Sequence, residues 1–296
     1  MPCRSFGFGS FLSDGFNLSF SLSNSLLSFL CIMYESLLEL TDVSTGYTDK
    51  HGKKVISSHL SASLREGRLT CLLGPNGAGK STLLRTMAAF QPLLDGHISL
   101  KGKSLSAYSI QERARLISIV LTERPKNLNM TVEEVVSLGR SPFTGFWGRF
   151  RESDKRVVDE CLSLIGIEGF RHRKISSLSD GERQKAMIAK SMAQETPIVF
   201  LDEPTAFLDY PSKVKTMLLL HQLTRSLGKT VFLSTHDMEH ALWIADEIWL
   251  LDRERGLTTG TPEQLSENGK IGEFFNCEAM TYIPAARRFS IALRSK

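Results

Sequence analysis

The residues best suited to chemistry form a glycine-rich segment that ends in Lys80, Ser81 and Thr82. It fits the spacing G-x-x-x-x-G-K-[ST], in which glycines let backbone N–H groups turn inward around phosphate oxygens. The N-terminus of a following helix favours the anion, the lysine adds a charge at the β- and γ-phosphates, and the serine hydroxyl is positioned for Mg²⁺. The segment therefore predicts a nucleoside triphosphate site. Its residues are Gly74, Pro75, Asn76, Gly77, Ala78, Gly79, Lys80, Ser81 and Thr82.

A second chemical group is the pair of carboxylates that follows the apolar run Ile198–Leu201. A buried strand that ends in adjacent acids is costly unless the acids are used. We expect Asp202 to hold Mg²⁺, directly or through water, and Glu203 to orient and polarise an attacking water. Two exposed acids at a strand end would be the ordinary alternative, and the upstream phosphate loop disfavours it.

Both segments need a scaffold, and the chain from Met33 onward predicts an α/β domain. Apolar strand-like runs alternate with helical patterns, which is typical of a mostly parallel core sheet covered by helices. Residues 36–64 alternate polar and apolar side chains without a helix, which predicts an antiparallel β edge. The predicted core strands are Leu69–Leu73, Ile98–Leu100, Leu116–Leu121, Ile198–Leu201, Thr230–Ser234 and Glu247–Leu251.

Residues 130–194 form a mostly helical stretch within this pattern. Thr131 and Glu134 fit a capping box, and Gly166 follows apolar residues that recur at helical spacing. We predict a helical subdomain at 130–194, inserted between catalytic-core segments at 33–129 and 195–260. Residues 261–296 are then a C-terminal tail.

Residues 1–32 differ in composition, being rich in Ser, Phe, Leu, Asn and Gly. A membrane-spanning helix needs about 20 mostly apolar residues, and Ser and Asn interrupt this segment too often. A signal peptide needs a basic start, a clean apolar run and a small-residue cleavage site, and this segment does not fit that pattern. The composition favours a disordered tail or an upstream extension of the reading frame.

Overall composition excludes some classes of function. The chain has 36 basic and 32 acidic residues without a strongly basic block, so no nucleic-acid partner is expected. The five cysteines lack the spacing of a zinc or redox site and indicate reduced thiols in a cytosolic protein.

Residues 178–184 read Leu-Ser-Asp-Gly-Glu-Arg-Gln and resemble the signature motif of the ABC ATPase family. The resemblance covers nearly all of the chain from about Glu35 onward, because further motifs fall in the family's order. It implies the P-loop ABC ATPase fold, ATP and Mg²⁺ as cofactors, and ATP hydrolysis. In the family, Tyr47 would stack on adenine, Asp209 would couple two sites, and His236 would be the switch histidine that contacts the γ-phosphate. Without that pattern, His236 would be read as a buried core histidine.

The signature motif also bears on assembly. Ser179 and Gly181 would open a second helix whose N-terminus can receive a phosphate, so each ATP would be shared between two such ends. The resemblance implies that these residues complete the site of another copy in a head-to-tail homodimer.

One segment narrows the choice within the family. Residues 136–149 look like the subgroup that imports iron–siderophore complexes, haem and cobalamin. This likeness implies an integral-membrane permease, an extracytoplasmic substrate-binding protein, and a peripheral position on the cytoplasmic face of the bacterial inner (plasma) membrane. A soluble ABC ATPase would be expected to carry two ATPase domains or long coiled coils, and a regulatory subunit would be expected to lack Glu203 or His236.

The chain departs from the family at one position. The family usually carries Gln after the strand that matches Leu116–Leu121, whereas this chain has Thr122 and Glu123. Either side chain could offer an oxygen to Mg²⁺, and the carboxylate of Glu123 is the stronger ligand.

Overall fold

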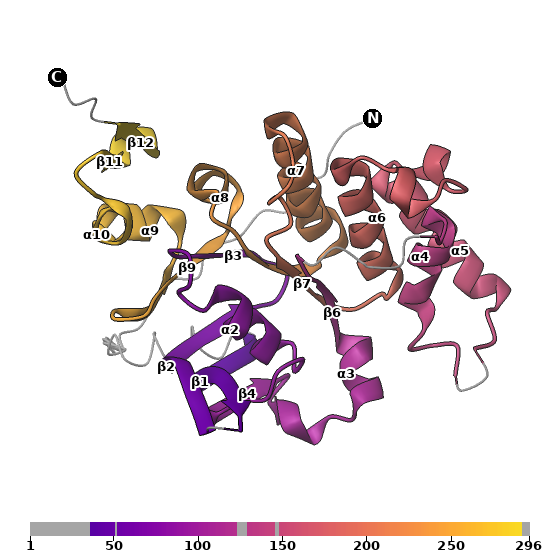
Figure 1. Ribbon diagram of the computed structural model, residues 1–296, viewed down its shortest axis with the longest axis horizontal. Coiled ribbons are helices and arrows are strands. Elements are labelled where there is room, and N and C mark those ends of the chain that lie inside the picture. The colour runs from indigo at the N-terminus through magenta and orange to yellow at the C-terminus, as the bar shows by residue number, and fades with distance from the viewer. Residues whose placement is uncertain (1–35, 51, 123–128, 146–147, 292–296) are drawn as a thin grey trace, which may run out of the picture. The chain divides into compact units, whose positions relative to one another are not determined.

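Two main sheets organise the part of the chain that the structure, a computed structural model, describes: residues 36–50, 52–122, 129–145 and 148–291 (Figure 1). The predicted N-terminal extension at 1–32, the candidate ligand Glu123 and Trp147 lie outside the described residues.

The central sheet has six strands in the order β10-β9-β3-β8-β7-β6. All neighbouring pairs are parallel except β10 and β9. Both faces are buried: on β7, Ile198 and Phe200 join one apolar cluster while Val199 and Leu201 join another. The strands are β3 (Leu69–Leu73), β6 (Ile117–Val120), β7 (Ile198–Asp202), β8 (Thr230–Ser234), β9 (Glu247–Asp252) and β10 (Gly256–Gly260).

The second sheet is antiparallel and has four strands in the order β2-β1-β4-β5. Antiparallel strands were expected over residues 36–64, and they occur there, but they form a sheet of their own. The predicted strand Ile98–Leu100 belongs to this sheet and not to the parallel one. The strands are β1 (Ser36–Asp49), β2 (Gly52–Arg65), β4 (Asp95–Leu100) and β5 (Lys103–Ser104).

Helices pack on both faces of the parallel sheet (Figure 1). Leu83, Leu84 and Met87 of α2 (Lys80–Met87) join the cluster that contains the antiparallel sheet. Residues of α7 (Tyr210–Leu227) and α8 (Met238–Ile244) join the other cluster. A short turn, η1 (Leu105–Ala107), and α3 (Ile110–Leu116) lead into β6.

Between β6 and β7, the regular elements of the described residues are all helical. The Thr131 capping box and the left-handed Gly166 at the end of α5 are both present as predicted. The elements are α4 (Val132–Ser137), η2 (Leu138–Arg140), α5 (Glu152–Ile165), η3 (Glu168–Phe170), η4 (Ile175–Ser177) and α6 (Asp180–Ala193).

The segment that the sequence analysis treated as a tail carries regular structure as far as Ile291. Phe275 and Tyr282 each contact Phe289, with ring centroids 6.3 Å and 5.1 Å apart. Its elements are α9 (Pro262–Glu267), α10 (Lys270–Phe275), β11 (Met280–Ile283), η5 (Pro284–Ala286) and β12 (Arg288–Ile291). Among the described helices, none combines the length and the apolar character that crossing a bilayer would require.

Candidate nucleotide site

The phosphate loop connects β3 to α2, as the spacing predicts. A Cβ on Gly74 would lie 2.2 Å from the Leu251 carbonyl oxygen, so only glycine allows the loop to pass β9 this closely. Gly79 adopts a left-handed conformation at the start of α2, with φ of +101°. The helix begins without a side-chain cap and without an acidic residue in its first turn. Its N-terminal dipole is therefore not offset by the protein's own acids, which suits an anion.

Lys80 reaches back over this loop. Its Nζ donates to the carbonyl oxygens of Gly74 at 2.8 Å and Pro75 at 3.2 Å. Burial lowers the pKa of Lys80, and the carboxylates of Glu203 and Asp202 oppose that effect. The ammonium group is thus held by carbonyls beside the acids that end β7.

Ser81 and Asp202 converge from different elements. Ser81 Oγ donates to Asp202 Oδ1 at 2.8 Å, and Ser234 Oγ donates to the same oxygen at 2.7 Å. A hydroxyl and a carboxylate are hard oxygen donors of the kind Mg²⁺ takes together with substrate phosphates. The pair supplies two such oxygens, and no cluster of three His, Cys, Asp or Glu side chains suited to a metal occurs among the described residues.

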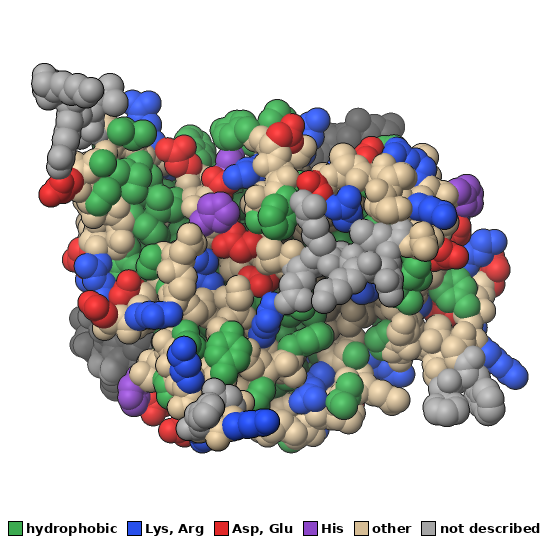
Figure 2. Space-filling model, in the orientation of Figure 1, with side chains coloured by type: hydrophobic (Ala, Val, Ile, Leu, Met, Phe, Trp, Pro, Cys, Tyr) green, Lys and Arg blue, Asp and Glu red, His purple; other side chains and the backbone are tan. Residues whose placement is uncertain are grey.

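Glu203 and His236 meet at the ends of β7 and β8. His236 Nδ1 lies 2.7 Å from Glu203 Oε2. Glu203 has φ of +50°, a left-handed conformation that non-glycine residues adopt rarely and that is often found at functional sites. Its N–H donates to the Ser234 carbonyl oxygen at 3.1 Å, which fixes the turn. In Figure 2, acidic and histidine side chains lie close together over the place where Figure 1 labels α8 and β3.

Tyr47 lies at another side of the site, on β1. Its ring is 48% exposed, and its hydroxyl lies 3.1 Å from Thr82 Oγ1. An exposed ring held beside the phosphate loop is available to stack on a base. The site is an open depression of about 350 Å³. Its lining comprises Tyr47, Ile56, Asn76, Gly77, Gly79, Lys80, Ser81, Thr82, Glu203 and Arg253.

Ser179, Gly181 and Asp209 do not line this depression. Ser179 caps α6 in a full capping box, and Asp209 caps α7 by accepting from the Ser212 N–H at 3.2 Å. A Cβ on Gly181 would lie 3.3 Å from Ser212 Oγ, so the starts of α6 and α7 are neighbours. The structure brings these three residues together with each other but not with the nucleotide depression of the same chain.

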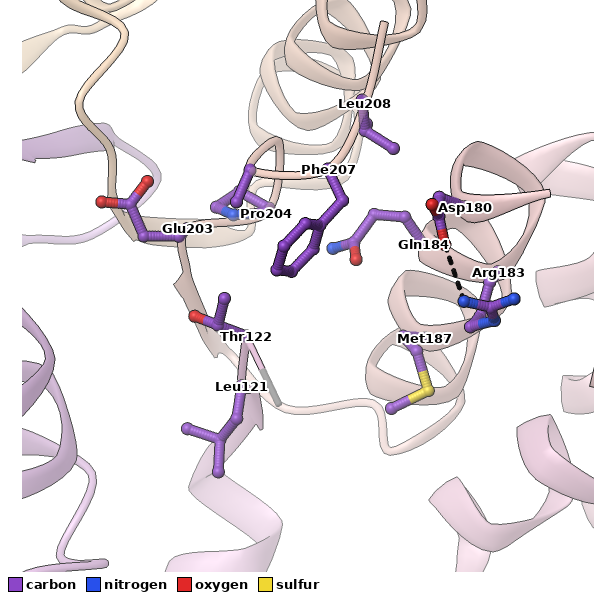
Figure 3. A pocket seen from close by; sticks show the side chains of 11 residues that line it. Leu121, Thr122, Asp180, Arg183, Gln184, Met187, Glu203, Pro204, Phe207 and Leu208 are labelled. Carbon is purple, nitrogen blue, oxygen red and sulfur yellow. Dashed lines mark hydrogen bonds and ion pairs between the residues drawn. The ribbon is translucent and has the colours of Figure 1, made fainter. Parts of the chain in front are cut away.

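Thr122 occupies the junction between the core and the helical segment (Figure 3). Its hydroxyl donates to the Asp202 carbonyl oxygen at 2.7 Å. A cavity of about 40 Å³ separates it from Gln184 of α6, with Phe207 also on its wall, and the Glu203 side chain points away from this cavity (Figure 3). Thr122 thus contacts the backbone of Asp202 at the end of β7. Its neighbour Glu123 is outside the described residues.

Three residues that the sequence analysis did not single out support the site. Ser57 donates to the Ala78 carbonyl oxygen at 3.2 Å, and Arg253 Nε donates to that of Gly77 at 2.7 Å. Ser234 holds Asp202, as described above. Only Ser234 carried a sequence signal, since it comes two residues before His236. Ser57 and Arg253 reach the loop from distant parts of the chain.

Fold and site together define a P-loop ATPase with an inserted helical segment that carries a signature motif. The ABC transporter family model matches residues 57–206. The chain belongs to the ABC transporter family as an ATP-binding subunit, and it is an ATP hydrolase of the ABC type.

Several relatives match this chain over most of their own length. An uncharacterized ABC transporter ATP-binding protein of Methanocaldococcus jannaschii is 35% identical, over 83% of this chain and 83% of the relative. The petrobactin import ATP-binding protein FpuC of Bacillus anthracis is 35% identical over 77% of this chain and 84% of its own length. The ferric enterobactin transport ATP-binding protein FepC of Escherichia coli is 34% identical over 78% and 85%.

Solved structures share the fold. An ABC transporter assigned to the metal-chelate type, in an inward-facing conformation, has a TM-score of 0.67 and 26% identity, covering 78% of this chain and 86% of the other. The ATP-binding cassette MJ0796, dimeric and bound to ADP and Pi after hydrolysis, has a TM-score of 0.66 and 25% identity over 76% and 98%.

Proposed function

We propose that this subunit hydrolyses ATP to drive import of an iron–siderophore complex or a related metal chelate through a membrane permease. The observation that carries the proposal is the agreement among relatives. FpuC and FepC, named for petrobactin import and ferric enterobactin transport, align with more than three quarters of this chain. The segment 136–149, which looks like the same subgroup, points in the same direction.

The chemistry rests on Glu203 as general base. Its carboxylate would orient and polarise the water that attacks the γ-phosphate, and His236 would contact that phosphate from the end of β8. Lys80 and the loop amides would hold the β- and γ-phosphates. When bound, Mg²⁺ would neutralise developing charge on the phosphates; Ser81 and Asp202 would hold it, with Glu123 as a further candidate ligand.

Assembly follows from where the signature residues lie. Ser179 and Gly181 do not line the depression of their own chain, so they would complete the site of a second copy in a head-to-tail homodimer. Asp209, next to them, would couple the two sites. The dimeric state of the similar cassette MJ0796 supports this arrangement.

The proposed membrane partners follow from the proposed role in import. The substrate pathway would belong to integral-membrane permease subunits, and an extracytoplasmic substrate-binding protein would deliver the chelate to them. The subunit would then sit peripherally on the cytoplasmic face of the bacterial inner membrane. Within it, we propose a catalytic core at 33–129 and 195–260 and a helical subdomain at 130–194.

The experiment that tests this function is uptake in the native organism. Deleting the gene should abolish uptake of a ⁵⁵Fe-loaded siderophore, and the wild-type gene should restore it while a Glu203→Gln gene does not. Uptake of haem and of cobalamin is measured in the same strains. Loss of either one, with normal siderophore uptake, would identify that compound as the substrate. Normal uptake of all three in the deletion strain would overturn the proposal, as would failure to co-purify with a polytopic membrane protein.

A further inference from the structure

Asp237 lies at the N-cap position of α8, yet its side chain makes no capping hydrogen bond. Aspartate at this position normally accepts from a backbone N–H of the first turn and stabilises the helix. Asp209 does so at the start of the neighbouring helix α7. The two helices therefore begin with the same residue type in different roles, and the Asp237 carboxylate is used elsewhere.

The carboxylate of Asp237 contacts two cationic or titratable groups. Lys213 Nζ donates to Oδ2 at 3.0 Å. His240 Nδ1 lies 3.0 Å from Oδ1, outside regular hydrogen-bond geometry. The three side chains are only 16% to 22% exposed. Burial raises the pKa of Asp237, but the contacts with Lys213 and His240 lower it by more, so the pKa lies below its ordinary value.

Lys213 comes from the first turn of α7, which begins directly after Asp209. Tyr210 of the same turn packs on His240, with ring centroids 5.2 Å apart. The start of α7 is thus joined to the start of α8 by an ion pair and a ring contact. Desolvation offsets much of the Coulomb energy of a buried ion pair, so this contact matters here as a link between the two helices.

The residues on both sides of His236 are held by hydrogen bonds. His236 is held on one side by Thr235, whose N–H donates to the Leu72 carbonyl oxygen at 3.1 Å. On the other side, the Asp237 N–H donates to Thr235 Oγ1 at 3.0 Å while its carboxylate is held by Lys213. Between these two residues, the His236 ring lies against Glu203, with Nδ1 2.7 Å from Oε2.

We propose that Lys213 is a positioning residue for ATP hydrolysis, which holds Asp237 so that His236 stays aligned with Glu203 and the γ-phosphate. The inference rests on the proposed roles of Glu203 and His236. It adds that the alignment of the switch histidine depends on the helix that follows Asp209. Movement of the Asp209 loop would then reach His236 through Lys213.

The test compares Lys213→Met with Lys215→Met, an exposed lysine on the same helix. Lys213→Met should lower kcat roughly ten- to hundredfold, because small displacements of catalytic groups have effects of that size. ATP affinity and KM should stay within about twofold, since the phosphate loop is untouched. Lys213→Arg, which retains a cation, should recover most of kcat, and Lys215→Met should behave as wild type.

A double-mutant cycle tests whether Lys213 acts through Asp237. Lys213→Met combined with Asp237→Asn should be no slower than the slower single variant, because both remove one interaction. Glu203→Gln serves as the reference: if it hydrolyses ATP normally, the proposed site is wrong. If Glu203→Gln is inactive but Lys213→Met keeps its kcat, only the role of Lys213 is refuted. A Lys213→Met variant that loses ATP affinity and thermal stability together with kcat would equally overturn the inference, since that pattern indicates general damage.

Discussion

The starts of α2 and α6, the two helix ends that we propose to contact ATP, are built in opposite ways. The first turn of α2 has no acidic residue and no side-chain cap, and it carries Lys80. The first turn of α6 contains Asp180 and Glu182, and Ser179 closes a capping box with Glu182. Ser179 Oγ also donates to Glu182 Oε2 at 2.9 Å.

This difference indicates which end binds nucleotide first. At α2 an incoming phosphate meets a favourable dipole and a cation, so a lone subunit should bind ATP there. At α6 the hydroxyl and the helix dipole are already engaged by the chain's own carboxylate. A phosphate must therefore compete with Glu182, and the signature end should contribute only when a second subunit presents bound ATP to it.

Removing the cation at α2 should have the largest effect. Lys80→Ala should weaken ATP binding by roughly a hundredfold or more, the scale seen when one partner of a buried charge pair is removed. Titration with a fluorescent ATP analogue measures this, with Lys215→Ala as the control for loss of a surface charge. Near-normal affinity would mean that the helix end suffices without the lysine.

A variant that binds ATP but cannot hydrolyse it, with the starts of α2 and α6 both intact, should form a stable dimer. Glu203→Gln keeps the shape of the side chain and removes its charge, so hydrolysis should fall by about a hundredfold or more. ATP should then convert the variant to a dimer on size-exclusion chromatography with light scattering. A variant that stays monomeric in saturating ATP would contradict the idea that both ends share a nucleotide.

Ser179→Ala removes the hydroxyl at α6 only. Steady-state hydrolysis should fall by about a hundredfold, as for loss of one donor to a transition-state charge, while ATP binding to the monomer stays normal. Ser109→Ala is the matched control, because Ser109 caps α3 in the same kind of box with Glu112. Equal losses in both variants would reduce the role of Ser179 to helix capping.

The smallest effect is expected at the junction between the two regions. Thr122→Val keeps the shape and removes the hydrogen bond to Asp202, so hydrolysis should fall by about two- to tenfold, the range for one hydrogen bond. Glu123→Ala, measured beside it at varied Mg²⁺ concentrations, should give the larger loss if that carboxylate is the metal ligand. Coupled uptake and ATPase rates that remain at wild-type values in both variants would remove this junction from the mechanism.

Much of the fold follows from local patterns. β3 and β8 begin and end at the predicted residues, and every residue of both strands is buried. The phosphate-loop spacing likewise needed no tertiary information. By contrast, the periodicity around Ile98 says that a strand forms but not which sheet it joins, since that depends on pairing with β1 far along the chain.

The same limit applies to the site. The motifs located Lys80, Asp202, Glu203 and His236, whose types and spacing predict the chemistry. They did not reveal Arg253, which contacts the Gly77 carbonyl oxygen across 176 residues of chain. Residues 261–291 contain short elements held by aromatic contacts, and such packing leaves little periodic signal.

The left-handed backbone of Glu203 has a consequence for how this protein can evolve. A non-glycine residue in this conformation costs of order 1–3 kcal/mol. Glycine at position 203 would relieve that strain, and it would remove the side chain that we propose as general base. Under that proposal, a more stable variant at this position would be a less active one. Position 203 would thus exchange stability for turnover, whereas β7 itself contains no residue with a positive φ.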